Sequence, residues 1–216
     1  MEMINLTPAL QEHDQLRADI YALLGNLLRS APSAETLEWL STLTPDNDDS
    51  GSMADAWSAL ALTANYATEA SIADEYQDLF IGVGRGELMP FGCWYLTGSL
   101  MEKPLVQLRN DLTQLGYVRQ PDVYEPEDHI AALCEVMSLM ILNHHGYSQQ
   151  HTFWQRHIAP WARKFFSDLQ HAKRAVFYSP IGLLGEHFVQ KEADYFQQLS
   201  PAELTTVSAS HNKNSG

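Results

Sequence analysis

Apolar residues recur at helical spacing through almost the whole of this 216-residue chain. The first set stands at successive intervals of four, three and four positions and consists of Leu16, Ile20, Leu23 and Leu27. Residues at these intervals share one face of an α-helix. Alternation of apolar and polar residues, the pattern of a strand, never extends beyond a few positions. The sequence therefore predicts an all-α fold, a multi-helix bundle built around shared apolar faces.

Seven further helices are predicted from the same spacing and from the residues that begin and end them. Pro104 suits the first turn of one helix and Gly116 lies just past its end, while Pro126 is expected at the first position of the next. Residues 82–98, with their repeated glycines, interrupt the pattern, and residues 46–52 are expected to form a polar loop. The predicted helices span residues 33–40, 53–64, 72–80, 104–115, 126–140, 160–169 and 181–199.

The connection at residues 117–124, which contains Pro121, is the predicted boundary between two helical halves. We expect an N-terminal half over residues 1–120 and a C-terminal half over residues 121–200. Residues 201–216 have little apolar content and are expected to be a disordered tail.

The formal net charge is −14, from 27 acidic and 13 basic side chains. Such a surface repels the phosphates of nucleic acids and of anionic lipids, so binding to either is not expected. Its field would attract a basic partner segment, although solubility alone explains the charge equally well.

The cysteines and the N-terminal sequence bear on the compartment. Cys93 and Cys134 each stand alone, outside any metal-ligand spacing, which is typical of a reducing compartment. The first basic residue is Arg17, so the charged start of a secretory signal is missing, and no apolar run approaches the roughly 18 residues of a membrane span. We expect a cytoplasmic protein without stable membrane insertion.

The densest polar cluster is residues 122–129, which holds four acids and one histidine but no basic side chain. Acids in the first turn of a helix that begins at Pro126 would complement the positive end of its dipole. They could instead bind a guanidinium group through charge-assisted hydrogen bonds, with the titratable histidine beside them. Spacing alone favours the first interpretation, in which the acids stabilise the helix through its dipole. The cluster consists of Asp122, Glu125, Glu127, Asp128 and His129.

A glycine-punctuated aromatic stretch covers residues 79–95. Its segment 82–86 lacks the Gly-Lys-Ser/Thr of a phosphate loop and follows no predicted strand, so a nucleotide site is not indicated. Its Met, Phe, Trp and Tyr side chains could form an apolar groove for a peptide or could pack into the core. The pattern alone favours the second interpretation, in which these side chains pack into the core.

The alternative to a binding protein is an enzyme, a helical metal-dependent hydrolase that uses Asp128 and His129. Glu125 and His129 stand four residues apart, as metal ligands on one helix can, but the sequence has no HExxH motif. No serine, cysteine or lysine stands in a recognisable nucleophile context. We therefore expect no catalytic residues, no metal site and no cofactor.

Four segments resemble, in the same order, those of the TorD/DmsD family, the chaperones dedicated to maturation of molybdenum-cofactor redox enzymes. Residues 125–129, Glu-Pro-Glu-Asp-His, resemble the family's E-P-x-D-H motif. Residues 76–82 are similar to its aromatic-x-x-Leu-Phe segment, residues 90–95 to its Pro-aromatic stretch, and residues 157–161 to the start of its Pro-Trp helix. The resemblance covers about residues 10–200.

The resemblance implies an all-helical TorD-like fold in two parts, with a hinge near residues 125–129. It also implies a chaperone rather than an enzyme, one that binds the twin-arginine signal peptide of an exported oxidoreductase and holds the apoenzyme until its cofactor is loaded. The implied partner is the precursor of a molybdoenzyme catalytic subunit. Weak GTP binding, and a monomer or a domain-swapped dimer, are further implications.

The residues that match the family motifs form the implied leader-binding surface. Its apolar part consists of Tyr76, Leu79, Phe80, Pro90, Phe91 and Tyr95. Its polar part consists of Glu125, Pro126, Asp128 and His129. Phe91 and Tyr95 stand where some relatives carry tryptophan, which leaves the identity of the client enzyme open.

Overall fold

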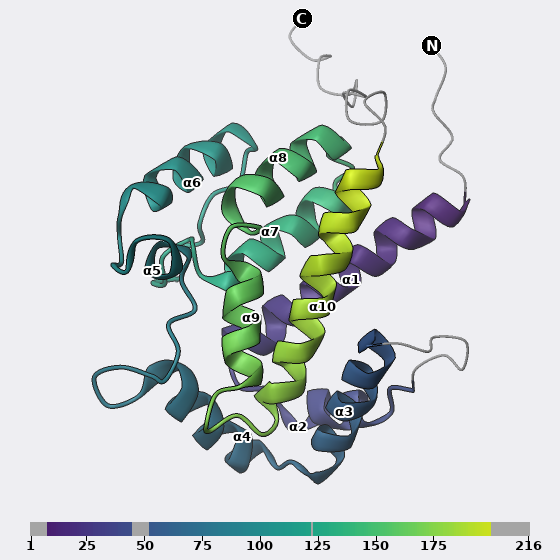
Figure 1. Ribbon diagram of the computed structural model, residues 1–216, viewed down its shortest axis with the longest axis vertical. Helices are drawn as coiled ribbons and strands as arrows, with labels where there is room; N and C mark the ends of the chain where they lie inside the picture. The colour runs from purple at the N-terminus through teal and green to yellow at the C-terminus, as the bar shows by residue number, and fades with distance from the viewer. Residues whose placement is uncertain (1–7, 45–51, 122, 200–216) are drawn as a thin grey trace, which may run out of the picture.

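The computed structural model describes residues 8–44, 52–121 and 123–199. Within these ranges it is all-helical and contains no strand, which confirms the predicted fold class (Figure 1). A π-helical turn, Gln77–Ile81, continues α4. The helices are α1 (Pro8–Arg29), α2 (Ala34–Ser41), α3 (Ser52–Tyr66), α4 (Glu69–Tyr76), α5 (Gly92–Thr97), α6 (Lys103–Gln114), α7 (Ile130–Leu142), α8 (Tyr147–His157), α9 (Ala162–Gln170) and α10 (Tyr178–Gln198).

Helices from distant parts of the sequence pack against one another. α1 lies against α7, and α10 lies between α9 and α3, which also packs on α2 (Figure 1). Glycines permit the closest approaches: a Cβ at Gly185 would lie 2.2 Å from the Phe166 ring, so α9 and α10 could not pack this tightly with any larger residue there. At Gly25, a Cβ would meet the Ala131 carbonyl oxygen at 3.2 Å, which brings α1 close to α7. The predicted division at residue 120 stays a prediction.

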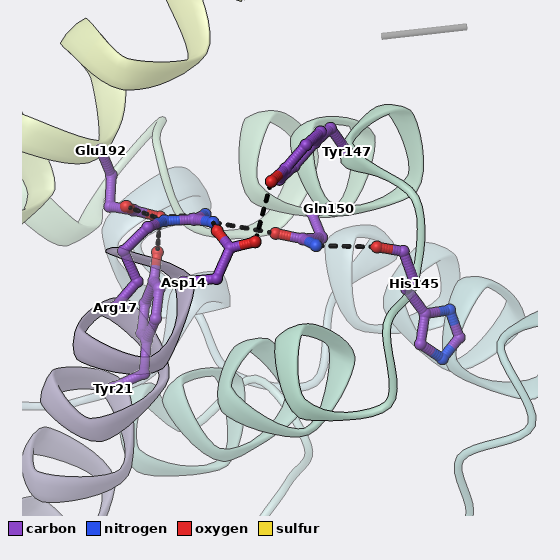
Figure 2. A network of polar contacts seen from close by, with 7 residues as sticks. All are labelled: Asp14, Arg17, Tyr21, His145, Tyr147, Gln150 and Glu192. Carbon is purple, nitrogen blue, oxygen red and sulfur yellow. Dashed lines mark hydrogen bonds and ion pairs between the residues drawn. The ribbon is translucent and has the colours of Figure 1, made fainter. Parts of the chain in front are cut away.

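A buried ion pair joins α1 to α10 (Figure 2). The Arg17 Nε donates to Glu192 Oε1 at 2.7 Å and its Nη2 donates to Oε2 at 2.9 Å, and Tyr21 adds a hydrogen bond to the same carboxylate. The Arg17 and Glu192 side chains are only 3% and 2% exposed. On its other edge, the guanidinium donates to Asp14 and to Gln150 of α8. The network therefore ties three helices together through a single arginine.

The start of α7 differs from the prediction. The helix begins at Ile130 rather than at Pro126, and His129 is its N-cap, with extended dihedral angles. The physical reason is tertiary: the backbone on both sides of His129 bonds to residues 90–92, which holds residues 128–130 in an extended conformation. Asp128 is therefore not the first-turn acid that the sequence suggested.

Other boundaries and faces also differ. α8 was not predicted, because its eleven residues are mostly polar and carry little apolar periodicity. α5 lies within the stretch that was predicted to interrupt the helical pattern. α9 begins at Ala162 rather than at Pro160, and Pro180 lies in the first turn of α10 rather than before that helix. Leu16, predicted on the inner face, is 57% exposed, because the buried face of α1 is centred on Tyr21 and Leu24; Ile20 and Leu27 of the predicted face lie within it and are buried. Most of the predicted loop at 46–52 and all of the predicted tail lie outside the described residues.

Candidate functional site

The aromatic segment and the Glu-Pro-Glu-Asp-His motif meet side by side. The Gly92 N–H donates to the Asp128 carbonyl at 2.9 Å, and the Ile130 N–H donates to the Pro90 carbonyl at 2.9 Å. These two bonds form an isolated antiparallel bridge between Phe91 and His129. Two segments that are about 35 residues apart in sequence are thus one structural unit.

The Asp128 carboxylate strengthens this junction instead of facing solvent. Its Oδ2 accepts a hydrogen bond from the Cys93 N–H at 2.7 Å, and the residue is only 5% exposed. The bond satisfies a backbone donor in the first turn of α5, which would otherwise be buried without a partner. Asp128 therefore fixes the position of the aromatic segment, and its oxygens are poorly placed to reach a ligand.

His129 is neutral and has a defined tautomer. Its Nδ1 accepts a hydrogen bond from the Ala131 N–H at 3.1 Å, so the ring proton resides on Nε2. The rings of His129 and Phe91 are nearly perpendicular, with their centroids 5.1 Å apart. Burial lowers the pKa of His129 to about 4, and the positive charge of Arg29 contributes to the shift.

The lowered pKa predicts a stability that depends on pH. In the unfolded chain His129 takes up a proton near pH 6.5, whereas in the folded protein it resists protonation until about pH 4. The contribution of His129 to the free energy of unfolding is thus fully present above pH 6.5 and is lost as the pH falls from 6.5 to about 4. Between pH 7 and pH 5 the His129 contribution to the free energy of unfolding should fall by about 2 kcal/mol.

The test is urea denaturation of the parent and of His129→Asn at pH 7 and pH 5. Asparagine retains an N-cap acceptor but does not titrate, so the difference in stability between the two pH values should shrink by that amount. Replacement of the exposed His171 by asparagine is the control and should leave the pH dependence as it is. An unchanged pH dependence in His129→Asn would show that His129 is not the titrating group.

The remaining acids of the motif differ in availability. Glu127 forms ion pairs with Arg109 at 2.9 Å and with Arg119 at 3.7 Å. Partial burial opposes ionisation of Glu127, but hydrogen bonding from Arg109 outweighs it and lowers the pKa. Glu125 is exposed and has no ion pair among the described residues. Asp122 lies outside the described residues. Glu125 is therefore the motif carboxylate that is free to receive a cation.

A pocket of about 220 Å³ opens beside the motif, between the end of α1, the 117–129 connection and α7. Its wall is mainly apolar, and three carboxylates, two arginines and His129 interrupt it. Such a composition suits a ligand that has both an apolar body and charged groups. The motif residues in the wall are Glu125, Pro126, Glu127 and His129, and the others are Arg29, Leu112, Tyr117, Val118, Arg119, Gln120, Val123, Ala132, Glu135, Val136 and Leu139.

The structure divides the predicted apolar residues into three groups. Tyr76 is half-buried and its hydroxyl donates to the Arg29 carbonyl at 2.7 Å, which places it next to the pocket, and Phe91 is half-buried against His129. Tyr95 faces α9 instead, where its ring stacks on Trp161. A last group is buried and supports the others from within, and it comprises Leu79, Phe80 and Pro90.

The pocket residues outside the motif were not predicted. Arg29 and Glu135 form an ion pair across 106 positions of sequence, and neither belongs to a recognisable local pattern. Only the packing of α1 on α7 brings them together. No group of three His, Cys, Asp or Glu side chains in the described part of the chain could hold a metal ion, and none of the described helices is both long and apolar enough to cross a membrane.

Comparison with known proteins gives concordant matches. The model of the family described as nitrate reductase delta subunit matches residues 46–167. The chain is 30% identical to the chaperone protein TorD of Psychrobacter sp. over 61% of its own length and 65% of that protein, and 24% identical to the TorD of Aliivibrio fischeri over 79% and 90%. It is 30% identical to DmsD of Haemophilus influenzae, named as a Tat proofreading chaperone, over 53% and 56%. The match thus spans less than two thirds of two of these three relatives.

A solved structure agrees on the fold. A crystal structure from Archaeoglobus fulgidus, described as a redox enzyme maturation protein, aligns with a TM-score of 0.50 at 16% identity. The alignment covers 88% of this chain and 99% of the other. At this level of identity the similarity concerns the arrangement of helices alone.

Proposed function

The chain belongs to the nitrate reductase delta subunit family, together with the TorD and DmsD chaperones, and from this premise we propose a specific chaperone function. It binds the twin-arginine signal peptide and the apo form of a molybdenum-cofactor oxidoreductase. It acts in the cytoplasm and holds this precursor for cofactor insertion before export. The family consists of chaperones rather than enzymes, so no reaction is assigned to the chain.

The observation that carries the proposal is the junction of the two motif segments beside a pocket. The bridge between Phe91 and His129 joins a half-buried aromatic surface to the Glu-Pro-Glu-Asp-His segment. A leader with two arginines followed by an apolar stretch needs carboxylates next to apolar surface. Exposed Glu125 and the apolar pocket wall offer that combination.

The overall charge of the chain supports the same partner. A net charge of −14 would accelerate the approach of a basic leader and would weaken binding to most acidic proteins. Recognition would then depend on the local contacts at the junction, with the long-range field affecting mainly the rate of association. GTP binding and the oligomeric state stay predictions from the family resemblance.

Replacing Phe91 by alanine should weaken leader binding about tenfold. Loss of a partly buried aromatic contact costs on the order of 1–2 kcal/mol, and this loss should hardly depend on salt because no charge is removed. Titration calorimetry with a synthetic peptide that carries two consecutive arginines and an apolar stretch measures the affinity. Trp39→Ala, which removes a half-exposed aromatic side chain on α2, is the matched control and should bind as the parent does.

Two outcomes would contradict the proposal. If the folded parent protein does not bind the twin-arginine peptide, the proposed function is wrong. If the parent binds it and Phe91→Ala, still folded, binds equally well, the peptide binds elsewhere on the molecule.

A further inference from the structure

Two arginines of α1 are held in contrasting ways. Arg17 is 3% exposed and uses both Nε and Nη2 on one carboxylate, a bidentate geometry that is typical of a permanent structural pair. Arg29 is 35% exposed and contacts Glu135, itself 49% exposed, through Nη2 alone. Its Nε is buried without a hydrogen-bond partner among the described residues. The guanidinium of Arg29 is therefore only partly satisfied.

This weakly held pair lies inside the pocket. Arg29 and Glu135 both line it, as do Glu125 and His129. The close approach of α1 to α7 explains the position, because Gly25, one helical turn before Arg29, lies against Ala131 and the Glu135 side chain. The chain itself thus supplies two guanidinium groups to the pocket wall: that of Arg119, which pairs with Glu127, and that of Arg29, which contacts Glu135.

The other polar groups of the pocket show what remains available to a ligand. Glu127 is held by Arg109 and Arg119, whereas Glu125 has no ion pair among the described residues. His129 lines the pocket and is only 8% exposed. Its Nε2–H has no hydrogen-bond acceptor among the described residues. A peptide carbonyl could accept that bond, and an arginine side chain could occupy the place of Arg29.

We propose that the pocket holds a guanidinium-binding site whose carboxylate is Glu135, and that Arg29 fills this site until an arginine of the client displaces it. The inference rests on the proposed function and adds a residue, Glu135, that lies outside the family motifs. It also assigns Arg29 the role of an internal competitor. A surface-exposed pair of this kind contributes little to folding, so its exchange for an equivalent intermolecular pair costs the protein little stability.

Removal of the competitor should tighten binding. In titration calorimetry with the twin-arginine peptide, Arg29→Gln should raise the affinity about two- to fivefold, and Glu135→Gln should lower it by a similar factor. The double variant Arg29→Gln/Glu135→Gln should bind the peptide no more tightly than Glu135→Gln alone, because the carboxylate for which Arg29 competes is absent. A peptide with both arginines replaced by glutamine should bind the parent and Glu135→Gln with equal affinity.

Matched controls separate this site from the general charge of the protein. Arg163 and Glu186 form an exposed ion pair between α9 and α10, so Arg163→Gln and Glu186→Gln change the net charge by the same amounts. Neither should change the affinity by as much as the corresponding pocket variant. Thermal unfolding of every variant verifies that each is folded.

The proposal is overturned if Arg29→Gln binds the peptide no more tightly than the parent, or if Arg163→Gln tightens binding equally. It is also overturned if Arg29→Gln still tightens binding when Glu135 is glutamine. If the folded parent does not bind the peptide, the proposed function itself fails. If the parent binds and only the Arg29 effect is missing, the function stands and this inference alone is wrong.

Discussion

Replacing Glu192 by alanine is expected to lower the free energy of unfolding by about 3–5 kcal/mol, the largest effect we predict for a single side chain. The substitution leaves the Arg17 guanidinium buried without the carboxylate that takes two of its hydrogen bonds, and it removes the acceptor of the Tyr21 hydroxyl (Figure 2). Asp14 would still accept one hydrogen bond from Nη1, but the Nε and Nη2 donors would be left buried without a partner, which costs far more than the net contribution of the pair itself.

Urea denaturation of the parent and Glu192→Ala measures this loss. Glu186→Ala, which breaks the exposed pair with Arg163, is the control and should cost no more than about 1 kcal/mol. The double variant Arg17→Met/Glu192→Leu should lose less stability than Glu192→Ala alone, because both charges are removed together. A loss below 1 kcal/mol in Glu192→Ala would mean that water reaches the pair in solution.

Asp128→Ala is expected to cost about 2–3 kcal/mol of stability and also to weaken leader binding about tenfold. The carboxylate is buried and accepts the Cys93 N–H, so its removal leaves a backbone donor at the start of α5 without a partner. Binding suffers because α5 and the preceding aromatic residues lose their fixed position relative to the motif. Asp128→Asn retains an acceptor oxygen and should recover part of both losses.

The salt dependence distinguishes this indirect role from direct contact. If Asp128 only positions α5, the loss of affinity in Asp128→Ala should be nearly the same at low and at high salt. If the carboxylate instead forms an ion pair with a leader arginine, the loss should fade as salt rises and the free energy of unfolding should change little. The second pattern would contradict the placement of Asp128 described above.

The sequence predicted helices wherever packing makes a single apolar face. In α7 the apolar residues at helical spacing, Ile130, Leu133, Met137 and Met140, are all buried. α8 was missed because half of its buried face is polar: Gln150, Phe153, Trp154 and His157 stand at the helical spacing of one face, but only Phe153 and Trp154 are apolar. A search for apolar periodicity cannot detect a face that buries a glutamine and a histidine.

The start of α7 shows why local signals can mislead. Pro126 followed by two acids has the composition of a first helical turn, and propensity alone predicts a helix there. The bridge to residues 90–92 overrides that preference. Since the bridge depends on residues more than thirty positions away, no reading of residues 122–130 could reveal it.

Only those residues of the candidate site that lie in contiguous sequence motifs could be predicted. Its motif residues are contiguous, so Glu125 and His129 could be identified from sequence, together with the nearby aromatic segment. Arg29 and Glu135 were not identifiable, because their pairing depends on how α1 crosses α7 and each looks like an ordinary charge on a helix surface. The different environments of the motif acids likewise depend on neighbours that only the fold brings close: Asp128 accepts the Cys93 N–H, Glu127 pairs with two arginines, and Glu125 is exposed.

Amide hydrogen exchange of the protein, with and without its twin-arginine precursor, tests the central claim most directly. The account predicts slower exchange on binding in residues 76–95 and 123–139, which contain the junction and the α7 wall of the pocket. A second groove, of about 590 Å³ between α1, α2, α3 and α10, is the internal comparison and should show no change. Protection confined to that groove, or no protection at the junction of a protein that binds the precursor, would contradict the account.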